Sequence, residues 1–237
     1  MCSGQGRGLQ MLAGTGGPGP YTPGVTELAT AFAMGFLIGT LPAAWVIVHF
    51  TRSKDVSSQG SGNVGALNAL RVARSKWVGI SVMILDMLKG AAAVWAAAWW
   101  FGWDVYGPLG AATVGVVGGH NYNPWLSWAR GKLVGGKGFA AASGALFVVT
   151  PWVVPAWLGS CVLAWVFFRK THGIVDEAPA SAVATLACVG WGYLLYDVSV
   201  AWTCLGIFLL CMPKIWPELR VLFAASPESV DEAPRDA

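Results

Sequence analysis

Two glycine-rich segments of this 237-residue sequence carry residue types that bind phosphate. The first, residues 60–71, reads GSGNVGALNALR. Glycines let backbone N–H groups come close to an anion, and the N-terminus of a following helix adds the positive end of its dipole. Asn63 and Asn68 are neutral donors, and the Arg71 guanidinium can hold two phosphate oxygens at once. The pattern favours a phosphate site, with a flexible loop of small residues as the alternative.

The second segment, residues 118–138, reads GGHNYNPWLSWARGKLVGGKG and has a similar character. Lys137 stands between glycines, where its ammonium group is a point charge available to a phosphate. His120 lies at the expected end of a helix beside this basic stretch. A catalytic and a structural role for this histidine both stay open.

Neither segment is a nucleotide-binding motif. The glycine spacing of the first fits the GxGxxG fingerprint, but that fingerprint follows a strand, and here the flanking segments are apolar. The second nearly completes a Walker A motif at Lys137, but Gly138 stands where a Ser or Thr hydroxyl binds magnesium. We therefore expect neither a dinucleotide enzyme nor a nucleotide hydrolase.

Two charges stand inside an otherwise apolar segment. Asp86 and Lys89 are three residues apart, so on a helix they share one face and can pair. Charges within a bilayer are costly and face protein or a wet cavity. A substrate site and a structural ion pair both stay open. The sequence contains no metal-ligand cluster and no recognisable catalytic triad, so we expect no metal and no cofactor.

The composition indicates a membrane protein. The chain is 55% hydrophobic and 11% charged, with a mean hydropathy of +0.57. Soluble domains carry about 25% charged residues, so this chain cannot cover a globule in water. Its basic residues do not line one soluble face, which argues against a nucleic-acid partner.

Seven apolar segments predict an all-α integral membrane protein, because ~20 apolar residues cross a ~30 Å hydrocarbon core. Residues 25–224 form the multi-pass domain, between a disordered Gly/Pro-rich tail at 1–24 and an acidic tail at 225–237. The predicted helices are Leu28–Phe50, Trp77–Phe101, Pro108–His120, Phe139–Thr150, Trp152–Phe168, Ser181–Tyr196 and Val198–Met212.

The charges between these segments alternate. Every second loop contains Lys or Arg, and the intervening loops contain none. By the positive-inside rule the basic loops are cytoplasmic, which puts the N-terminus outside and the C-terminus inside. The basic loops hold Arg52, Lys54, Arg71, Arg74 and Lys76, then Arg130, Lys132 and Lys137, then Arg169 and Lys170, then Lys214 and Arg220.

The order and spacing of these motifs resemble the PlsY family. The matching pieces are LIGTLP at residues 37–42, the segment 60–71, DMLKG at 86–90, Gly119 with His120, and GGKG at 135–138. The resemblance runs from about Gly35 to Arg169, with a weaker echo at Ala180 and Ser181. Together the motifs are highly specific, although each alone is weak.

The resemblance implies a membrane acyltransferase that uses no cofactor and works near the cytoplasmic face of a bacterial plasma membrane. It would move an acyl group from acyl phosphate to the 1-hydroxyl of sn-glycerol 3-phosphate, giving lysophosphatidic acid and phosphate in phospholipid synthesis. Its partners would be these two substrates and membrane lipids. The expected catalytic residues are His120, Asn68 and Ser61. The expected substrate- and phosphate-binding residues are Gly62, Asn63, Gly65, Arg71, Lys89, Gly135, Gly136, Lys137 and Gly138.

The chain also departs from the family pattern. Leu67 stands where the family usually has Thr, Ser57 where it has Arg, and the stretch between His120 and Gly135 is longer than usual. Residues 214–220, KIWPELR, correspond to a family motif that carries His and Asn. These differences predict lower activity or an altered donor or acceptor. The alternative function is a non-catalytic or transport homologue that binds phosphorylated solutes or lipids on the same scaffold.

Overall fold

The computed structural model describes residues 22–174 and 177–224, and these residues form helices without any strand. The all-α prediction is therefore confirmed for this part of the chain. Residues 1–21 of the predicted N-terminal tail and all of the predicted acidic tail lie outside the described residues.

The first predicted segment is divided into α1 (Val25–Gly39) and α2 (Ala43–Arg52). The break falls at Leu41 and Pro42, because the residue before a proline avoids the helical conformation and Pro42 itself has ψ 66°. The prediction of one continuous helix was wrong here. Residues 25–52 nevertheless remain long and apolar enough to count as one candidate crossing.

Five segments of the described chain are long and apolar enough to cross a membrane. They are the first segment, α4 (Lys76–Phe101), α8 (Val153–His172), α9 (Ala178–Leu195) and residues 198–221 of α10 (Val198–Ala224). The other two predicted segments form shorter helices, α5 (Tyr106–Asn121) and α7 (Phe139–Val149). Twelve of the 16 residues of α5 are buried, so neighbouring helices cover it despite its length.

Small residues bring α1 and α5 into backbone contact. A Cβ atom on Gly35 would lie 2.1 Å from the carbonyl oxygen of Ala112, and one on Gly39 would lie 2.2 Å from that of Val116. Gly115 and Gly119 of α5 face α1 in the same way. Helices in a membrane associate through such close packing, because lipid supplies no hydrophobic driving force between them. The pair holds His120 at a fixed height in the bundle.

Glycines also bring α4 and α7 into backbone contact. A Cβ atom on Gly90 would lie 2.0 Å from the carbonyl oxygen of Ala141, and one on Gly144 would lie 1.9 Å from that of Met87. The α4 residues in these contacts directly follow Asp86, which lies near the start of α7 and lines a cavity together with Phe139.

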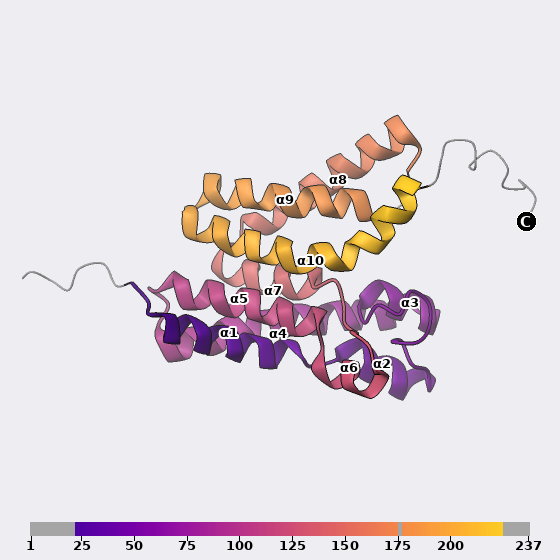
Figure 1. Cartoon of the computed structure of the whole chain (residues 1–237), viewed down its shortest axis with the longest axis horizontal. Coiled ribbons are helices and arrows are strands. Elements are labelled where there is room, and N and C mark those ends of the chain that lie inside the picture. Colours follow the sequence, from indigo (N-terminus) through magenta and orange to yellow (C-terminus); the bar gives the residue numbers. More distant parts are fainter. Residues whose placement is uncertain (1–21, 175–176, 225–237) are drawn as a thin grey trace, which may run out of the picture.

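The C-terminal helix is longer than predicted and bends towards its end (Figure 1). It continues past Met212 through Pro213 and Pro217. Each proline lacks the N–H that a carbonyl one turn earlier would accept. Side chains from α5 and its end support this region, because Asn121 Nδ2 and Tyr122 Oη donate to the carbonyl of Leu210 at 3.0 and 3.3 Å.

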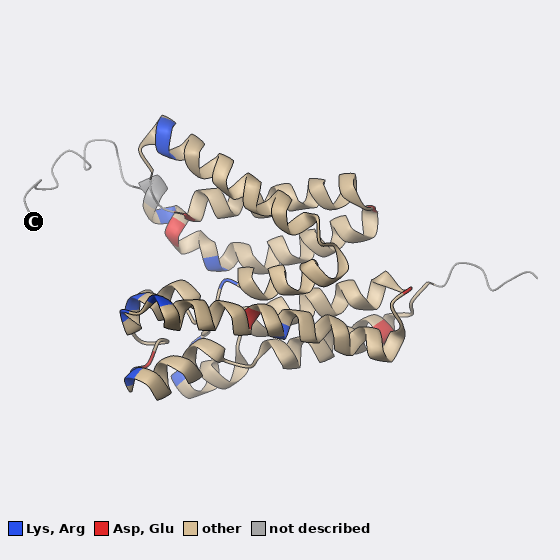
Figure 2. Cartoon of the chain, turned by 180° about the vertical axis from the view of Figure 1, so that it is seen from behind, with Lys and Arg blue, Asp and Glu red and all other residues tan. Residues whose placement is uncertain are grey.

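Two short helices occupy the basic end, where Figure 2 shows Lys and Arg gathered. They are α3 (Ala66–Ala73), which follows the first glycine-rich segment, and α6 (Pro124–Arg130), which forms part of the longer stretch after His120. An ion pair between Arg130 and Asp55 ties α6 to the loop between α2 and α3. The interior lysine, Lys89, is buried.

Candidate active site at the basic end of the bundle

The first glycine-rich segment folds around the side chain of Asn68, which is 1% exposed. Its Nδ2 lies 3.0 Å from the carbonyl oxygens of Val56, Gln59 and Asn63. Its Oδ1 accepts the N–H of Ser61 at 3.0 Å. The amide has no donor left for a substrate. In this structure Asn68 therefore shapes the loop, although the family resemblance implied a catalytic role.

Gly60 and Gly62 turn the chain around that amide with φ values of +60° and +71°, which side-chain-bearing residues rarely adopt. A Cβ atom on Gly60 would also lie 2.2 Å from Asn68 Oδ1. The turn leaves Ser61, Gly62 and Asn63 along one cavity wall. Gly65 then precedes α3 as its N-cap.

The second glycine-rich segment crosses the first. The N–H of Val64 donates to the carbonyl of Gly135 at 3.0 Å, and the N–H of Gly136 donates to the carbonyl of His120 at 3.0 Å. A Cβ atom on Gly135 would lie 2.1 Å from Asn121 O, and one on Gly136 would lie 1.9 Å from His120 Nε2. Only glycine fits at both positions without movement of the backbone or the imidazole. Gly138 ends the segment with φ +82° and caps α7.

Asp86, Lys89 and His120 form one buried polar group, each 7% exposed or less. Lys89 Nζ lies 2.8 Å from Asp86 Oδ1, 2.8 Å from His120 Nδ1 and 3.0 Å from the carbonyl of Leu41. The predicted Asp86–Lys89 pairing is thus confirmed. An ammonium between a carboxylate and a carbonyl donates to Nδ1, which assigns the imidazole proton to Nε2. His120 then offers an N–H donor rather than a basic nitrogen.

Residues of the two crossed segments line two cavities. The polar cavity, about 360 Å³, is bounded by both segments and by α10. The apolar cavity, about 460 Å³, lies among α4, α7 and α8. Asn63 and Lys137 line both cavities, and His120 and Asp86 line the apolar one. The apolar walls include Met83, Met87, Phe139, Val154, Trp157 and Leu158.

Lys137 stands at this junction and is anchored from α10. Its Nζ contacts Glu218 Oε2 at 2.6 Å, and its carbonyl accepts the Sγ–H of Cys211 at 3.0 Å. Lys214 of the same helix also lines the polar cavity. Sequence reasoning missed Lys214 and Glu218 as site residues. The available signals were the correspondence of residues 214–220 to a family motif and the three charged residues near the end of a mostly apolar helix.

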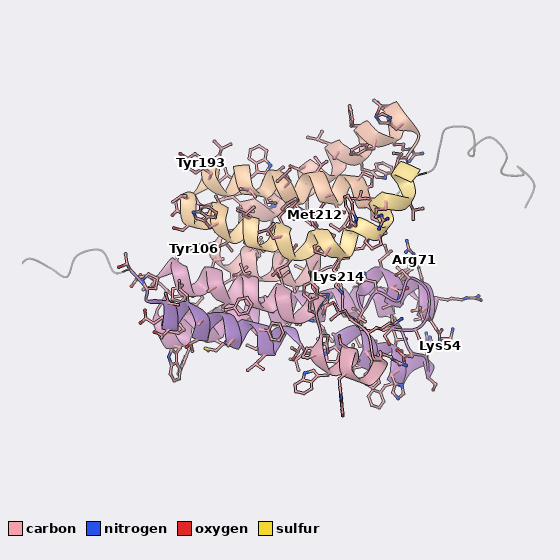
Figure 3. The ribbon with its side chains drawn as sticks, viewed as in Figure 1. Lys54, Arg71, Tyr106, Tyr193, Met212 and Lys214 are labelled. Carbon is pink, nitrogen blue, oxygen red and sulfur yellow. The ribbon has the colours of Figure 1, made fainter. Side chains whose placement is uncertain are left out.

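Four candidates line neither cavity: Asn68 and Gly136, which support the glycine-rich segments, and Arg71 and Lys89. Arg71 is exposed on α3, and Figure 3 shows it beside that helix at the basic end. Lys89 contacts its polar neighbours in the interior without lining either cavity. The remaining candidates meet at the junction or support it: Ser61, Gly62, Asn63, Gly65, Asn68, His120, Gly135, Gly136, Lys137 and Gly138.

Comparisons with known proteins agree on one family. Residues 29–223 match the family described as "Glycerol-3-phosphate acyltransferase". A glycerol-3-phosphate acyltransferase of Nitrobacter winogradskyi is 33% identical over 83% of this chain and 92% of its own length. One from Methylorubrum extorquens is 35% identical over 84% of this chain and 91% of its own.

Solved structures give the same result. A crystal structure of PlsY, described as an integral membrane glycerol 3-phosphate acyltransferase in its glycerol 3-phosphate form, matches with a TM-score of 0.69 at 25% identity. That match covers 87% of this chain and all of the other. The lysophosphatidic acid form matches with a TM-score of 0.65 at 28% identity, over 83% of this chain and 92% of the other.

Proposed function

The chain belongs to the glycerol-3-phosphate acyltransferase family and is a membrane enzyme of that activity, and we propose that its acyl donor is an acyl phosphate. The acyl group passes to the 1-hydroxyl of sn-glycerol 3-phosphate. The products are lysophosphatidic acid and inorganic phosphate.

The observation that supports this proposal is the junction between the two cavities. A polar cavity lined by lysines suits a small phosphorylated alcohol, and an apolar cavity among helices suits an acyl chain. Asn63 and Lys137 line both, so an acyl phosphate would place its phosphate between them with its chain in the apolar cavity. The acceptor would approach from the polar side.

The chemistry requires no enzyme nucleophile, because an acyl phosphate is already an activated mixed anhydride. The acceptor hydroxyl oxygen attacks the acyl carbon, and the bond from that carbon to the phosphate oxygen breaks. The electron pair leaves with the phosphate, which also takes up the hydroxyl proton. Lys137 neutralises the leaving phosphate, and the Nε2–H of His120 stabilises charge on the acyl oxygen. Binding both substrates at one junction supplies the remaining rate acceleration, because it holds the hydroxyl oxygen close to the acyl carbon.

The other site residues act by position. Gly62, Asn63 and Ser61 present the first segment to a phosphate, while Asn68 holds that segment in shape. Lys89 orients His120 through Nδ1. Exposed Arg71 contributes to the positive field that draws anionic substrates to this end.

The proposal includes an orientation. The five long segments, together with α5 and α7, would make seven crossings of a bacterial plasma membrane. The basic end would then face the cytoplasm, with the N-terminus outside and the C-terminus inside. Residues 25–224 would form a single transmembrane domain between the two tails.

The test is an assay of the purified full chain with acyl phosphate and glycerol 3-phosphate, following phosphate release. We expect turnover with acyl phosphate and none with acyl-CoA. Turnover with acyl-CoA alone would refute the donor assignment. Binding of glycerol 3-phosphate without turnover from either donor would instead favour the non-catalytic or transport homologue.

A further inference from the structure

A small inner cavity lies next to the apolar cavity, and the reaction above gives it no role. It measures about 20 Å³ and is lined by α7, α8, α9 and α10. Residues of α9 and α10 line only the inner one of these two cavities. The residues that line both are Phe139, Ser143, Val154 and Trp157.

Two aromatic rings separate the inner cavity from the apolar one. The ring centroids of Phe139 and Trp157 are 5.5 Å apart at an interplanar angle of 41°. Rings at this separation are in contact, so no chain passes between them. Along α7 the apolar cavity reaches Ser143, whereas the inner cavity reaches Leu146, almost a turn further from the junction at Lys137. The inner cavity therefore extends beyond the apolar cavity on the side away from the phosphate.

A hydrogen bond holds the Trp157 ring in this position. Its Nε1–H donates to Thr185 Oγ1 at 3.4 Å, and the Thr185 hydroxyl donates in turn to the carbonyl of Ser181 at 2.6 Å. Thr185 and Ser181 are buried on α9, which packs against both α8 and α10 (Figure 1). An indole N–H in apolar surroundings keeps its partner, because losing it is costly. The ring is thus tied to the neighbouring helix.

The inner cavity has room for no more than the end of an acyl chain. A cavity needs about 10–15 Å³ to hold one water-sized group, so about 20 Å³ holds roughly one. Its walls are mostly apolar, and the Thr185 hydroxyl is already hydrogen-bonded. A methyl group therefore suits this space better than water does. A longer piece of chain would fit only if the Trp157 ring were smaller.

We propose that Trp157 is the end wall of the acyl-chain site and limits the length of the acyl chain that the enzyme transfers. The phosphate of the donor is held at the junction, so each added methylene brings the end of the chain closer to this ring. Thr185 acts as a positioning residue, because it contacts the ring without lining the apolar cavity. This assignment rests on the proposed function, which places the acyl chain in the apolar cavity.

The experiment measures kcat/KM of the purified full chain for saturated acyl phosphates that lengthen by two methylenes at a time. In Trp157→Ala the preferred chain should be longer than in wild type by at least one such step. Beyond the wild-type optimum, each step should raise the ratio of variant to wild-type kcat/KM about fifteenfold, because burying one methylene is worth about a factor of four. The KM for glycerol 3-phosphate should change less than threefold, since Trp157 does not line the polar cavity.

Three further variants sharpen the comparison. Trp157→Phe retains a smaller ring and should shift the optimum less than Trp157→Ala does. Thr185→Val removes the acceptor but keeps a side chain of similar shape, so it should extend the range towards longer chains by a smaller amount. Trp152→Ala is the matched control, because Trp152 is exposed at the start of the same helix and lines neither the apolar nor the inner cavity. Its chain-length profile should equal that of wild type.

An unchanged chain-length profile in Trp157→Ala overturns the assignment. The chain would then leave the apolar cavity elsewhere, as between the exposed Met83 of α4 and Leu158 of α8. An equal loss of kcat/KM at every length overturns it as well. Either result leaves the proposed function intact as long as wild type turns over acyl phosphate.

Without turnover in wild type the proposed donor fails, and calorimetric titration with lysophosphatidic acids of increasing length then tests the end wall. Tighter binding of the longer ones to Trp157→Ala than to wild type and Trp152→Ala supports it, and equal or undetectable binding overturns it. Thermal melting establishes that each variant is folded, and Trp157→Phe takes the place of Trp157→Ala if the latter is not.

Discussion

At the scale of single residues, the buried polar group determines what His120 can do. Its Nδ1 is occupied by Lys89, whose charge is balanced by Asp86. A buried ion pair of this kind is costly to break, because removing one partner leaves the other charge uncompensated. The arrangement commits the imidazole to one tautomer and one orientation. Gly136 then gives its Nε2 atom the space it needs.

Gly136→Ala should therefore abolish most activity while the protein still folds. A Cβ atom at this position would lie 1.9 Å from His120 Nε2, so the ring or the backbone must move. An error of ~1 Å in a catalytic group costs about a hundredfold in rate. The measurement is kcat/KM for phosphate release, alongside thermal melting. Gly159→Ala is the control, because a Cβ atom there meets nothing within 4 Å. Equal activity in the two variants would contradict the site geometry.

Lys137→Gln and Arg71→Gln should differ, although the sequence presents both as phosphate ligands. Lys137 lines both cavities, so we expect its loss to lower kcat/KM about ten- to a hundredfold. Arg71 is exposed and lines neither cavity, so Arg71→Gln should lower kcat/KM less than threefold. This small effect should disappear at high ionic strength, because salt screens the field of an exposed charge. Kinetics at low and high ionic strength test this. A large, salt-independent loss of kcat/KM in Arg71→Gln would show that Arg71 contacts a substrate directly.

At the scale of helices, glycine contacts fix the helices so that the site residues lie at the same level of the bundle. The α1–α5 pair positions His120, and the α4–α7 pair positions Asp86 and the start of α7. These four helices form the frame into which the glycine-rich segments fold. The bent α10 then closes one side through its contacts with Lys137. The site therefore depends on helix separation as much as on its own side chains.

Gly144→Leu should force α4 and α7 apart. A Cβ atom at Gly144 would lie 1.9 Å from the carbonyl oxygen of Met87, which is backbone and cannot move aside alone. Overpacking of this kind costs roughly 1–3 kcal/mol of stability. We expect a lower melting temperature in detergent together with loss of activity. Gly190→Leu on α9 is the control, since its Cβ position is open. Equal melting temperatures for the two variants would show that the helices can separate freely.

At the scale of the molecule, charge and apolar surface give the bundle two different ends. Lys and Arg gather at one end (Figure 2), and the cavity junction opens among them. The long helices expose large apolar side chains such as Trp99, Leu163 and Leu194, as expected of surfaces that face lipid. An acyl chain can thus remain in an apolar setting while its phosphate meets the charged end.

Cysteine labelling tests the orientation of these ends. A Cys placed at Ser58 or Lys132, both exposed at the basic end, should resist a membrane-impermeant thiol reagent added to intact cells. A Cys at Asp104, in the exposed turn between α4 and α5, should react readily. The background is the chain with its native cysteines replaced. Labelling of the first two and protection of the third would invert the proposed topology.

The sequence by itself determined the features that depend on composition and on neighbouring residues. Low charge and long apolar segments specify membrane helices, and Asp86 and Lys89 pair because they are three positions apart on a helix. The motifs of residues 60–71 and 135–138 also identified the family that the comparisons found. These conclusions need no knowledge of which helices touch.

The tertiary structure decided what residues far apart in the chain do together. Asn68 and Arg71 belong to one motif, yet burial turns the first inward and leaves the second in solvent. Lys214 and Glu218 reach the site only because α10 bends and packs against a segment about 75 residues earlier. No local pattern encodes that approach, since it depends on how glycine contacts and prolines set the distances between whole helices.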